Sequence, residues 1–112
     1  MNVALLEVAQ QELDEAASYH SSQAPGFGDA FALELVAAID RIRRFPEAWH
    51  PLGDEVRRCR LRRFPYGVVY AKLEGGILVL AIAHMHRQPG DWRDRLGSQD
   101  AGRPASSGTS RG

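Results

Sequence analysis

The sequence lacks the residues that would cross-link a chain or anchor it in a membrane. It contains one cysteine, Cys59, which excludes a disulfide framework and a metal site built from cysteines. No apolar run approaches the length of a membrane span, and no basic and apolar leader precedes the first predicted element. We therefore expect a soluble, cytoplasmic protein with no membrane partner.

The common sequence signatures of catalysis are missing as well. There is no nucleophile elbow, no glycine-rich loop to cradle phosphates and no paired-carboxylate arrangement. His84 and His86 have the spacing of half a zinc site, but no third ligand is evident. We predict neither a cofactor nor a metal ion.

Basic residues are scarce in the first half of the chain, although the formal net charge of the whole is zero. Residues 1–50 contain three Lys or Arg against eight Asp or Glu, whereas residues 51–96 contain nine against five. This asymmetry favours an anionic partner for the second half. It does not say whether that partner is RNA, DNA or an acidic protein.

Large apolar residues are absent after residue 96. The segment 97–112 reads GSQDAGRPASSGTSRG, a composition that cannot bury enough surface to offset its chain entropy. We expect one folded domain over residues 1–96 and a disordered Gly/Ser-rich tail over residues 97–112. A core of this size needs tight packing or a partner to be comfortably stable.

The spacing of apolar residues predicts two amphipathic helices. The first begins near Ala9, carries apolar residues at helical intervals and is broken by Pro25-Gly26. The second begins near Phe27 and stops just before Pro46. Two such helices joined by a short Pro-Gly link are typical of a helical hairpin that lies on one face of a sheet.

Four other segments have the composition of strands. They are residues 2–7, 56–64, 66–73 and 77–83. The last is apolar on both faces, as expected of a central strand, and Glu74-Gly75-Gly76 before it forms a tight hairpin connection. Residues 46–55 are expected to form a loop. We predict an α+β fold in the order strand–helix–helix–strand–strand–strand, with a small antiparallel sheet and the helical hairpin packed on one face.

The strand predicted over residues 56–64 is rich in arginine. Alternation places Arg58, Arg60 and Arg62 on one face, about 7 Å apart, with Cys59 and Leu61 on the other. That spacing is close to the phosphate spacing of an extended nucleic-acid strand, and guanidinium groups bind phosphate or carboxylate bidentately. The alternative is a solvated outer face whose charge discourages pairing with other strands.

A cluster of polar and aromatic residues follows the last predicted strand. A histidine there could act as a general acid or base, or His84 and His86 could simply pack at the strand end and face solvent. Trp92 could stack on a base or anchor a partner protein, and the alternative is that it closes the open end of a small core.

Several motifs together are similar to those of a known family. They are Leu52-Gly53, Val56-Arg57-Arg58, Arg62-Arg63-Phe64-Pro65-Tyr66-Gly67-Val68-Val69-Tyr70, Val79-Leu80-Ala81-Ile82-Ala83-His84, Arg87 and Trp92, preceded by Leu13-Asp14-Glu15-Ala16, Arg41-Ile42 and Phe45-Pro46. In combination they resemble the RelE/ParE superfamily of toxins from bacterial type II toxin–antitoxin systems, also called plasmid stabilisation proteins. The resemblance covers residues 2 to about 96. It implies the element order predicted above and a cognate antitoxin that forms a hetero-oligomer with the toxin.

The resemblance also implies roles for individual residues. RelE-like members cut mRNA in the ribosome, using basic residues on the sheet with a C-terminal His or Tyr, whereas ParE-like members bind DNA gyrase. In one nuclease branch an arginine stands three residues before the third-strand tyrosine, where this chain has Gly67 before Tyr70. The final His-Tyr of that branch falls on His86-Arg87, which keeps only the histidine.

The candidate site residues follow from these comparisons of motifs. Arg60, Arg62 and Lys72 are candidates for stabilising a pentavalent phosphate, and His84 or His86 for acid/base chemistry. The candidates for binding are Arg58, Lys72, Arg87, Trp92 and Arg93.

Three functional hypotheses remain open at this point. The first is a toxin that inhibits growth by acting on DNA gyrase or on translation and is neutralised by its antitoxin. The second is a ribosome-dependent mRNA endonuclease, and the third is a non-toxic basic module that binds nucleic acid. Whether the protein is an enzyme is not decided by the sequence.

Overall fold

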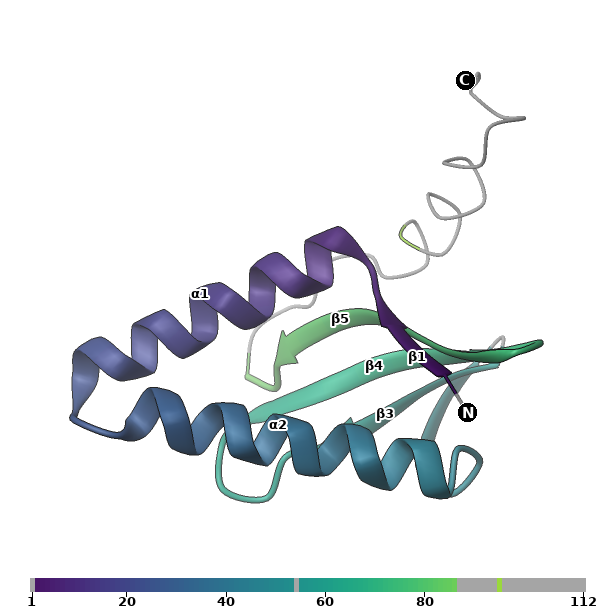
Figure 1. The fold of residues 1–112 in the computed structure, drawn as a ribbon. Coiled ribbons are helices and arrows are strands. Elements are labelled where there is room, and N and C mark those ends of the chain that lie inside the picture. The colour runs from purple at the N-terminus through teal and green to yellow at the C-terminus, as the bar shows by residue number, and fades with distance from the viewer. Residues whose placement is uncertain (1, 54, 87–94, 96–112) are drawn as a thin grey trace.

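Five strands form one sheet, and two helices pack across one of its faces (Figure 1). The computed structural model describes residues 2–53, 55–86 and 95. The elements are β1 (Asn2–Leu5), α1 (Glu7–Gln23), α2 (Phe27–Arg44), β2 (His50–Gly53), β3 (Val56–Arg60), β4 (Tyr66–Leu73) and β5 (Gly76–His84). The α+β class and the helical hairpin on one face agree with the sequence prediction.

The sheet has the strand order β1-β5-β4-β3-β2 and is mixed, not antiparallel as the sequence suggested. β1 pairs with β5 in parallel, whereas the other neighbours are antiparallel. β5 is apolar on both faces, as expected of a strand inside the sheet. A strand in that position has a hydrogen-bonded neighbour along each edge. β1 provides the second partner, while β4 is the middle strand.

Two further boundaries differ from the prediction. Residues His50–Gly53, expected to be part of a loop, form the short edge strand β2, in which Pro51 lies at an edge that can tolerate its missing N–H. β3 ends at Arg60 rather than at Phe64, because the chain turns away from the sheet over residues 61–65.

The helical hairpin requires glycine at its crossing point. α2 begins after Gly26, whose φ of 82° lies in the left-handed region. At Gly28 a Cβ atom would lie 2.8 Å from the carbonyl oxygen of Ala17 on α1, so only glycine permits this close approach. Phe31, Leu35 and other buried residues of α2 then face the sheet.

Each face of the sheet contributes to its own apolar cluster. The face that α1 and α2 cover, here called the helix face, carries Val68, Tyr70 and Val79. The face turned away from the helices, here called the outer face, carries Val56, Val69 and other residues of a second cluster: Ala71, Leu78, Leu80 and Ala81. Neither helix of the described part of the chain is long and apolar enough to span a membrane.

A β-bulge in β5 changes which residues share a face. The register with β4 shifts between Val69 and Tyr70, which leaves Leu80 as an extra residue between Val79 and Ala81. Before the bulge Leu78 faces the outer cluster, and after it Ile82 faces the helices. The faces of the last residues of β5 are therefore the reverse of what simple alternation predicts.

Candidate functional site

The arginines of β3 divide between the two faces of the sheet. Arg58 and Arg60 pair with Val69 and Gly67 of β4 and project from the outer face, as the alternation predicted. Arg57 lies on the helix face and donates from Nη1 to the carbonyl oxygen of Trp49 at 2.9 Å. Arg62 is exposed in the loop beyond the strand, so the predicted row of three is shortened to two.

Arg58 crosses over the glycine of the neighbouring strand. A Cβ atom on Gly67 would lie 2.9 Å from Cγ and 3.0 Å from Cδ of Arg58. The stem of Arg58 therefore occupies the space above Gly67 that a side chain would fill. Its Nε is buried, and no residue that the structure describes accepts its hydrogen. A buried donor without an acceptor costs about 1–3 kcal/mol, so this atom needs an explanation.

The arginine-rich loop after β3 is held by one carboxylate of α2. Oε1 of Glu34 accepts the backbone N–H groups of Arg62 and Arg63 at 2.8 and 3.1 Å, and Oε2 accepts Nε of Arg63 at 3.1 Å. Burial raises the pKa of Glu34, but the hydrogen bonds from Arg63 and Arg62 outweigh it, so the pKa is lowered overall. The side chain of Arg63 is thereby committed to a structural ion pair.

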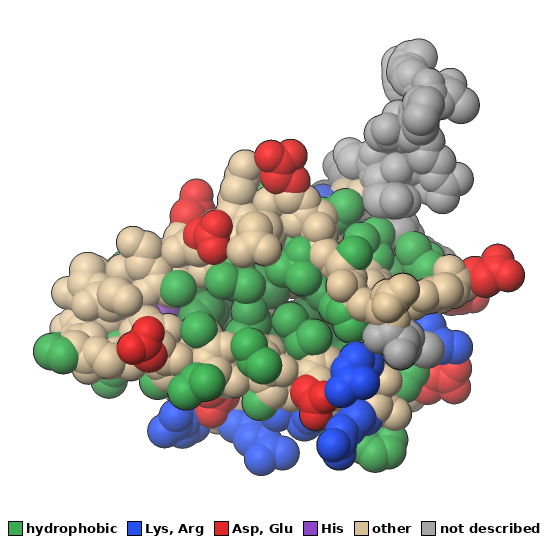
Figure 2. Space-filling model, in the orientation of Figure 1, with side chains coloured by type: hydrophobic (Ala, Val, Ile, Leu, Met, Phe, Trp, Pro, Cys, Tyr) green, Lys and Arg blue, Asp and Glu red, His purple; other side chains and the backbone are tan. Residues whose placement is uncertain are grey.

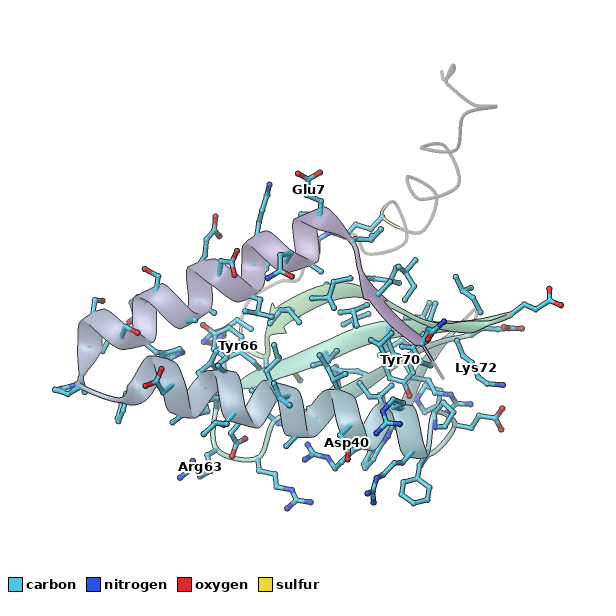
Figure 3. All side chains as sticks on the ribbon, viewed as in Figure 1. Glu7, Asp40, Arg63, Tyr66, Tyr70 and Lys72 are labelled. Atoms are coloured by element: carbon cyan, nitrogen blue, oxygen red, sulfur yellow. The ribbon has the colours of Figure 1, made fainter. Side chains whose placement is uncertain are left out.

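Lys72 lies far from the outer-face arginines. It pairs with Ile77 near the β4–β5 turn, projects from the helix face and contacts Glu47 at 3.3 Å. Figure 3 shows Lys72 and Arg63 at opposite ends of the molecule. Arg60 and Lys72, both candidates for stabilising a phosphate, therefore project from opposite faces of the sheet.

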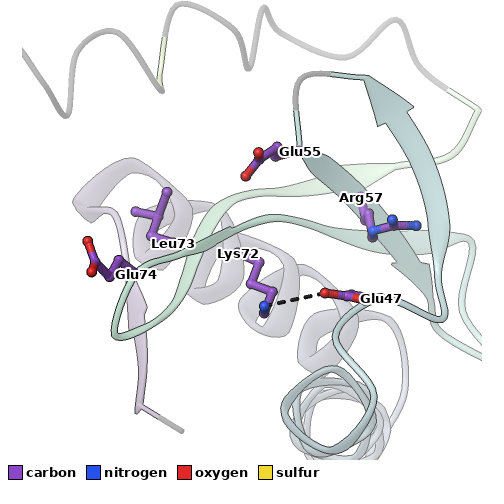
Figure 4. Close-up of a pocket in the computed structure, with 6 residues that line it drawn as sticks. All are labelled: Glu47, Glu55, Arg57, Lys72, Leu73 and Glu74. Atoms are coloured by element: carbon purple, nitrogen blue, oxygen red, sulfur yellow. Dashed lines mark hydrogen bonds and ion pairs between the residues drawn. The ribbon is translucent and has the colours of Figure 1, made fainter.

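A cleft of about 540 Å³ surrounds Lys72 (Figure 4). It is lined by Glu47, Glu55, Arg57, Lys72, Leu73 and Glu74. Three carboxylates against two cations make this an electrostatically mixed surface. It offers no concentrated positive charge for an anionic ligand.

The two candidate histidines lie beside an aromatic cluster at the other end of the sheet. His84 pairs with Tyr66, and their ring centroids are 4.9 Å apart on the helix face. The backbone N–H of His86 donates to Nδ1 of His84 at 3.1 Å, and the two rings are 5.6 Å apart. Tyr66 in turn contacts Phe31 of α2. The bulge thus places His84 on the face opposite Arg60.

The candidate catalytic residues on β3, the loop after it and the end of β5 are consequently dispersed. Arg60 projects from the outer face, Arg62 from the loop after β3, and His84 from the helix face with His86 beside it. Arg87, Trp92 and Arg93, predicted to bind a partner, lie outside the described residues, as does the tail 97–112. Among the described residues no three His, Cys, Asp or Glu side chains gather as a metal site would require.

The sequence also matches known proteins. The family described as "ParE toxin of type II toxin-antitoxin system, parDE" matches residues 3–89, which is most of the chain. The chain belongs to the ParE toxin family. This confirms the resemblance to the RelE/ParE superfamily that the motifs indicated.

Relatives of this ParE-family chain agree with that assignment. Two proteins named Toxin ParE2, from Mycobacterium tuberculosis strains CDC 1551 / Oshkosh and H37Rv, are each 35% identical to it over 81 residues. The aligned region covers 71% of this chain and 77% of each relative. A solved structure described as "Chromosomal ParDE TA system from P. aeruginosa" has the same fold, with a TM-score of 0.56 and 18% sequence identity. That match covers 77% of this chain and 97% of the other.

The sequence did not predict two structural contacts in this ParE-family chain. Oε1 of Glu12 on α1 accepts the N–H of Ile82 at 3.0 Å, and both its carboxylate oxygens bind Arg95. Arg95 also donates to the carbonyl oxygen of Leu80. These groups satisfy the edge of β5 beyond the end of β1. No sequence pattern predicts the contact between Glu12 and Arg95, because the two residues are 83 positions apart.

A second contact fixes the loop after α2. The buried hydroxyl of Tyr70 donates to the carbonyl oxygen of Pro46 at 2.6 Å, and burial raises the pKa of Tyr70 to about 12. The hydroxyl therefore stays protonated at physiological pH. Tyr70 is a core residue whose polar tip reaches the loop.

The helices of this ParE-family chain expose large apolar side chains. Leu33 and Val36 on α2 are 71% and 64% exposed, and they lie three positions apart on one side of the helix. Figure 2 shows apolar side chains gathered along the helix pair, with Lys and Arg along one border. Contiguous apolar surface of this kind marks interaction sites in soluble proteins.

Proposed function

We propose that the chain is a growth-inhibiting toxin that acts by binding DNA gyrase, and that a cognate antitoxin neutralises it. The observation that carries the choice of target is the separation of Arg60 from His84 by the sheet. The RelE/ParE superfamily divides between gyrase binders and mRNA endonucleases. This separation weighs against the second group.

Cleavage of RNA places strict demands on geometry. A general acid or base must come within hydrogen-bond reach, about 3 Å, of the group that exchanges its proton. The cations that stabilise the phosphorane must surround the same phosphate. Arg60 and Lys72 project from opposite faces, and His84 shares a face with neither Arg58 nor Arg60. Gly67 stands where a nuclease branch has arginine. The set that cleavage needs is thus incomplete among the described residues.

The antitoxin part of the proposal is supported by the exposed apolar side of α2. Leu33 and Val36 form an apolar surface on a helix whose opposite side is already buried against the sheet. An amphipathic helix or an extended apolar segment of a partner would remove this surface from water. The solved structure with the same fold is described as a ParDE toxin–antitoxin system, which is consistent with such a partner.

Induction in a bacterial host tests toxicity and neutralisation together. We expect growth arrest when the chain is induced alone, and relief when the neighbouring reading frame is co-induced. The purified chain should then inhibit supercoiling by gyrase in a reconstituted assay. Absence of arrest, or arrest that the neighbour does not relieve, would contradict the proposal.

Mapping of mRNA ends after induction separates the two targets. We expect no new cleavage sites within translated messages, and we expect Arg60→Ala and His84→Ala to leave the gyrase effect largely intact. The alternative, a ribosome-dependent mRNA endonuclease, predicts codon-linked cleavage that both substitutions abolish. A non-toxic nucleic-acid binder predicts binding that weakens steeply with added salt and no growth arrest.

A further inference from the structure

Arg58 is the best-positioned cation of the outer face. Its stem lies over Gly67, with Sδ of Met85 also close to that glycine. The stem is therefore confined between its own strand and the end of β5, which limits the rotamers that the guanidinium can adopt. A positioned guanidinium loses less freedom on binding than a flexible surface lysine does.

The guanidinium of Arg58 identifies the kind of group that the site would take. Its Nε is buried, with no acceptor among the described residues, so a partner would reach the guanidinium through its two Nη atoms. These two atoms form an edge through which a guanidinium binds a planar two-oxygen group bidentately. Arg60 projects from the same face two residues further along β3 and has no side-chain partner among the described residues.

The other cations of the described sheet and helices are mostly committed elsewhere. Arg63 is paired with Glu34, Lys72 with Glu47, and both Arg43 and Arg44 with Asp40. Arg57 donates to the carbonyl oxygen of Trp49, and Arg41 to that of Arg60. On the outer face, Arg58 and Arg60 therefore have no anionic partner among the described residues, and the stem of Arg58 is held over Gly67.

Charge arithmetic favours a carboxylate over a nucleic-acid backbone. Two phosphate contacts release few counterions, so they would bind a polyanion weakly at physiological salt. The formal net charge of the chain is zero, so long-range attraction to RNA or DNA is limited to the local excess of positive charge in the second half. A single carboxylate, by contrast, can bind the edge formed by the two Nη atoms in a partly buried setting where charge-assisted hydrogen bonds are strong.

We propose that Arg58, seated over Gly67 and flanked by Arg60, forms a receptor for a carboxylate of a protein partner. The proposal deepens the proposed function, on which it rests in taking the partner to be a protein. Gly67 acts as a positioning residue in this site. It leaves the space in which the stem of Arg58 lies, so that a residue of β3 supplies a guanidinium above the position where a nuclease branch has its own arginine.

Nuclear magnetic resonance of arginine Nε–H groups tests the site directly. The purified full chain is titrated with a decaglutamate peptide and, separately, with decauridylate RNA at matched ionic strength. We expect a saturable shift of the Arg58 Nε–H resonance with decaglutamate and little change with decauridylate. Arg58→Lys identifies the resonance by its loss and should weaken decaglutamate binding about tenfold.

Two controls make the result specific. The Nε–H of Arg63 already donates to Glu34 and should not move. Gly67→Ala introduces a Cβ against the flexible stem of Arg58 and should displace the guanidinium, with a loss of binding close to that of Arg58→Lys. Arg58→Lys keeps the charge and the stem, so it remains informative if Gly67→Ala destabilises the fold.

Three outcomes would overturn the carboxylate site. They are tighter binding of decauridylate than of decaglutamate, no response of Arg58 to either, and an equal response of Arg63. The measurement uses the isolated chain without gyrase or a bacterial host. A chain that fails to inhibit gyrase can therefore still pass this test, and the two proposals can fail separately.

Discussion

At the scale of single residues, Glu34 determines where the arginine-rich loop lies. One carboxylate on α2 accepts two backbone N–H groups and one guanidinium N–H from residues 62 and 63. The loop thus lies against the helix instead of continuing β3. This contact explains why the strand stops at Arg60, four residues earlier than the alternation of the sequence suggested.

Glu34→Gln should destabilise the fold by about 1–2 kcal/mol at neutral pH, because hydrogen bonds to a charged acceptor become neutral ones. The folded pKa of Glu34 is lowered, so its contribution is present above the ordinary value of 4.5 and is lost as pH falls through the folded pKa. The difference between the two proteins should therefore shrink in acid. Urea denaturation across a pH series measures it.

Asp40→Asn provides the matched control for that experiment. Asp40 also pairs with two arginines, but its side chain and theirs are 43–65% exposed. Such surface ion pairs contribute about 0–1 kcal/mol. A loss as large for Asp40→Asn as for Glu34→Gln would show that the anchored loop is not the cause.

At the scale of elements, α2 has two apolar sides with different roles. Phe31, Leu35 and Ile42 are buried against the sheet, whereas Leu33 and Val36 face away from the core. The second side adds nothing to the stability of the chain alone. Leu33 and Val36 remain largely uncovered by the described residues of the chain.

Leu33→Lys with Val36→Lys should leave the free energy of unfolding within about 0.5 kcal/mol of the parent, because surface changes are nearly neutral. The same pair of changes should weaken binding of the neighbouring gene product at least about tenfold, since apolar contact area is lost on one face. Calorimetric titration measures the affinity. Leu73→Lys, on a partly exposed residue of the β4–β5 hairpin, is the control and should leave the affinity unchanged.

The two helices could be predicted because their signals are local. Apolar residues recur at helical intervals, and Pro25-Gly26 and Pro46 mark the ends within the sequence itself. β2 could not be predicted in the same way. Its sequence, His-Pro-Leu-Gly, has the composition of a loop, and it becomes a strand only through pairing with β3.

At the scale of the whole molecule, stability should fall from the middle of the sheet toward its edges. β4 has hydrogen-bonded neighbours on both sides, and its residues from Tyr66 to Ala71 are buried. β2 has one neighbour, four residues and a proline. The middle strand β4 should therefore be more stable against local opening than the edge strand β2.

Amide hydrogen exchange should follow that gradient. The amides of Val68 and Tyr70 should exchange most slowly and that of Leu52 rapidly, with a difference on the order of a hundredfold or more. Exchange measured residue by residue under native conditions checks this. Comparable protection of Leu52 and Val68 would mean that β2 opens only with global unfolding, contrary to its edge position.

The candidate site could be predicted only in part, for reasons that act at this scale. Period-2 alternation correctly placed Arg58 and Arg60 together, because β3 is regular over that stretch. The parallel pairing of β1 with β5 could not be predicted, since the sequence of a short apolar segment does not indicate whether it pairs parallel or antiparallel with its neighbour. The distance of Lys72 from Arg60 and the commitment of Arg63 to Glu34 depend on long-range contacts, which motif spacing does not contain.

The bulge at Leu80 has a consequence for how such proteins diversify. The bulge in β5 reverses the face of every later residue in the strand relative to regular alternation. If the same residues paired with β4 without a bulge, His84 would lie on the same side as Arg60. The bulge thus separates an arrangement in which an imidazole and a guanidinium share a face from one in which the sheet lies between them. Related chains could differ in chemistry through strand pairing alone, while every side chain involved stayed the same.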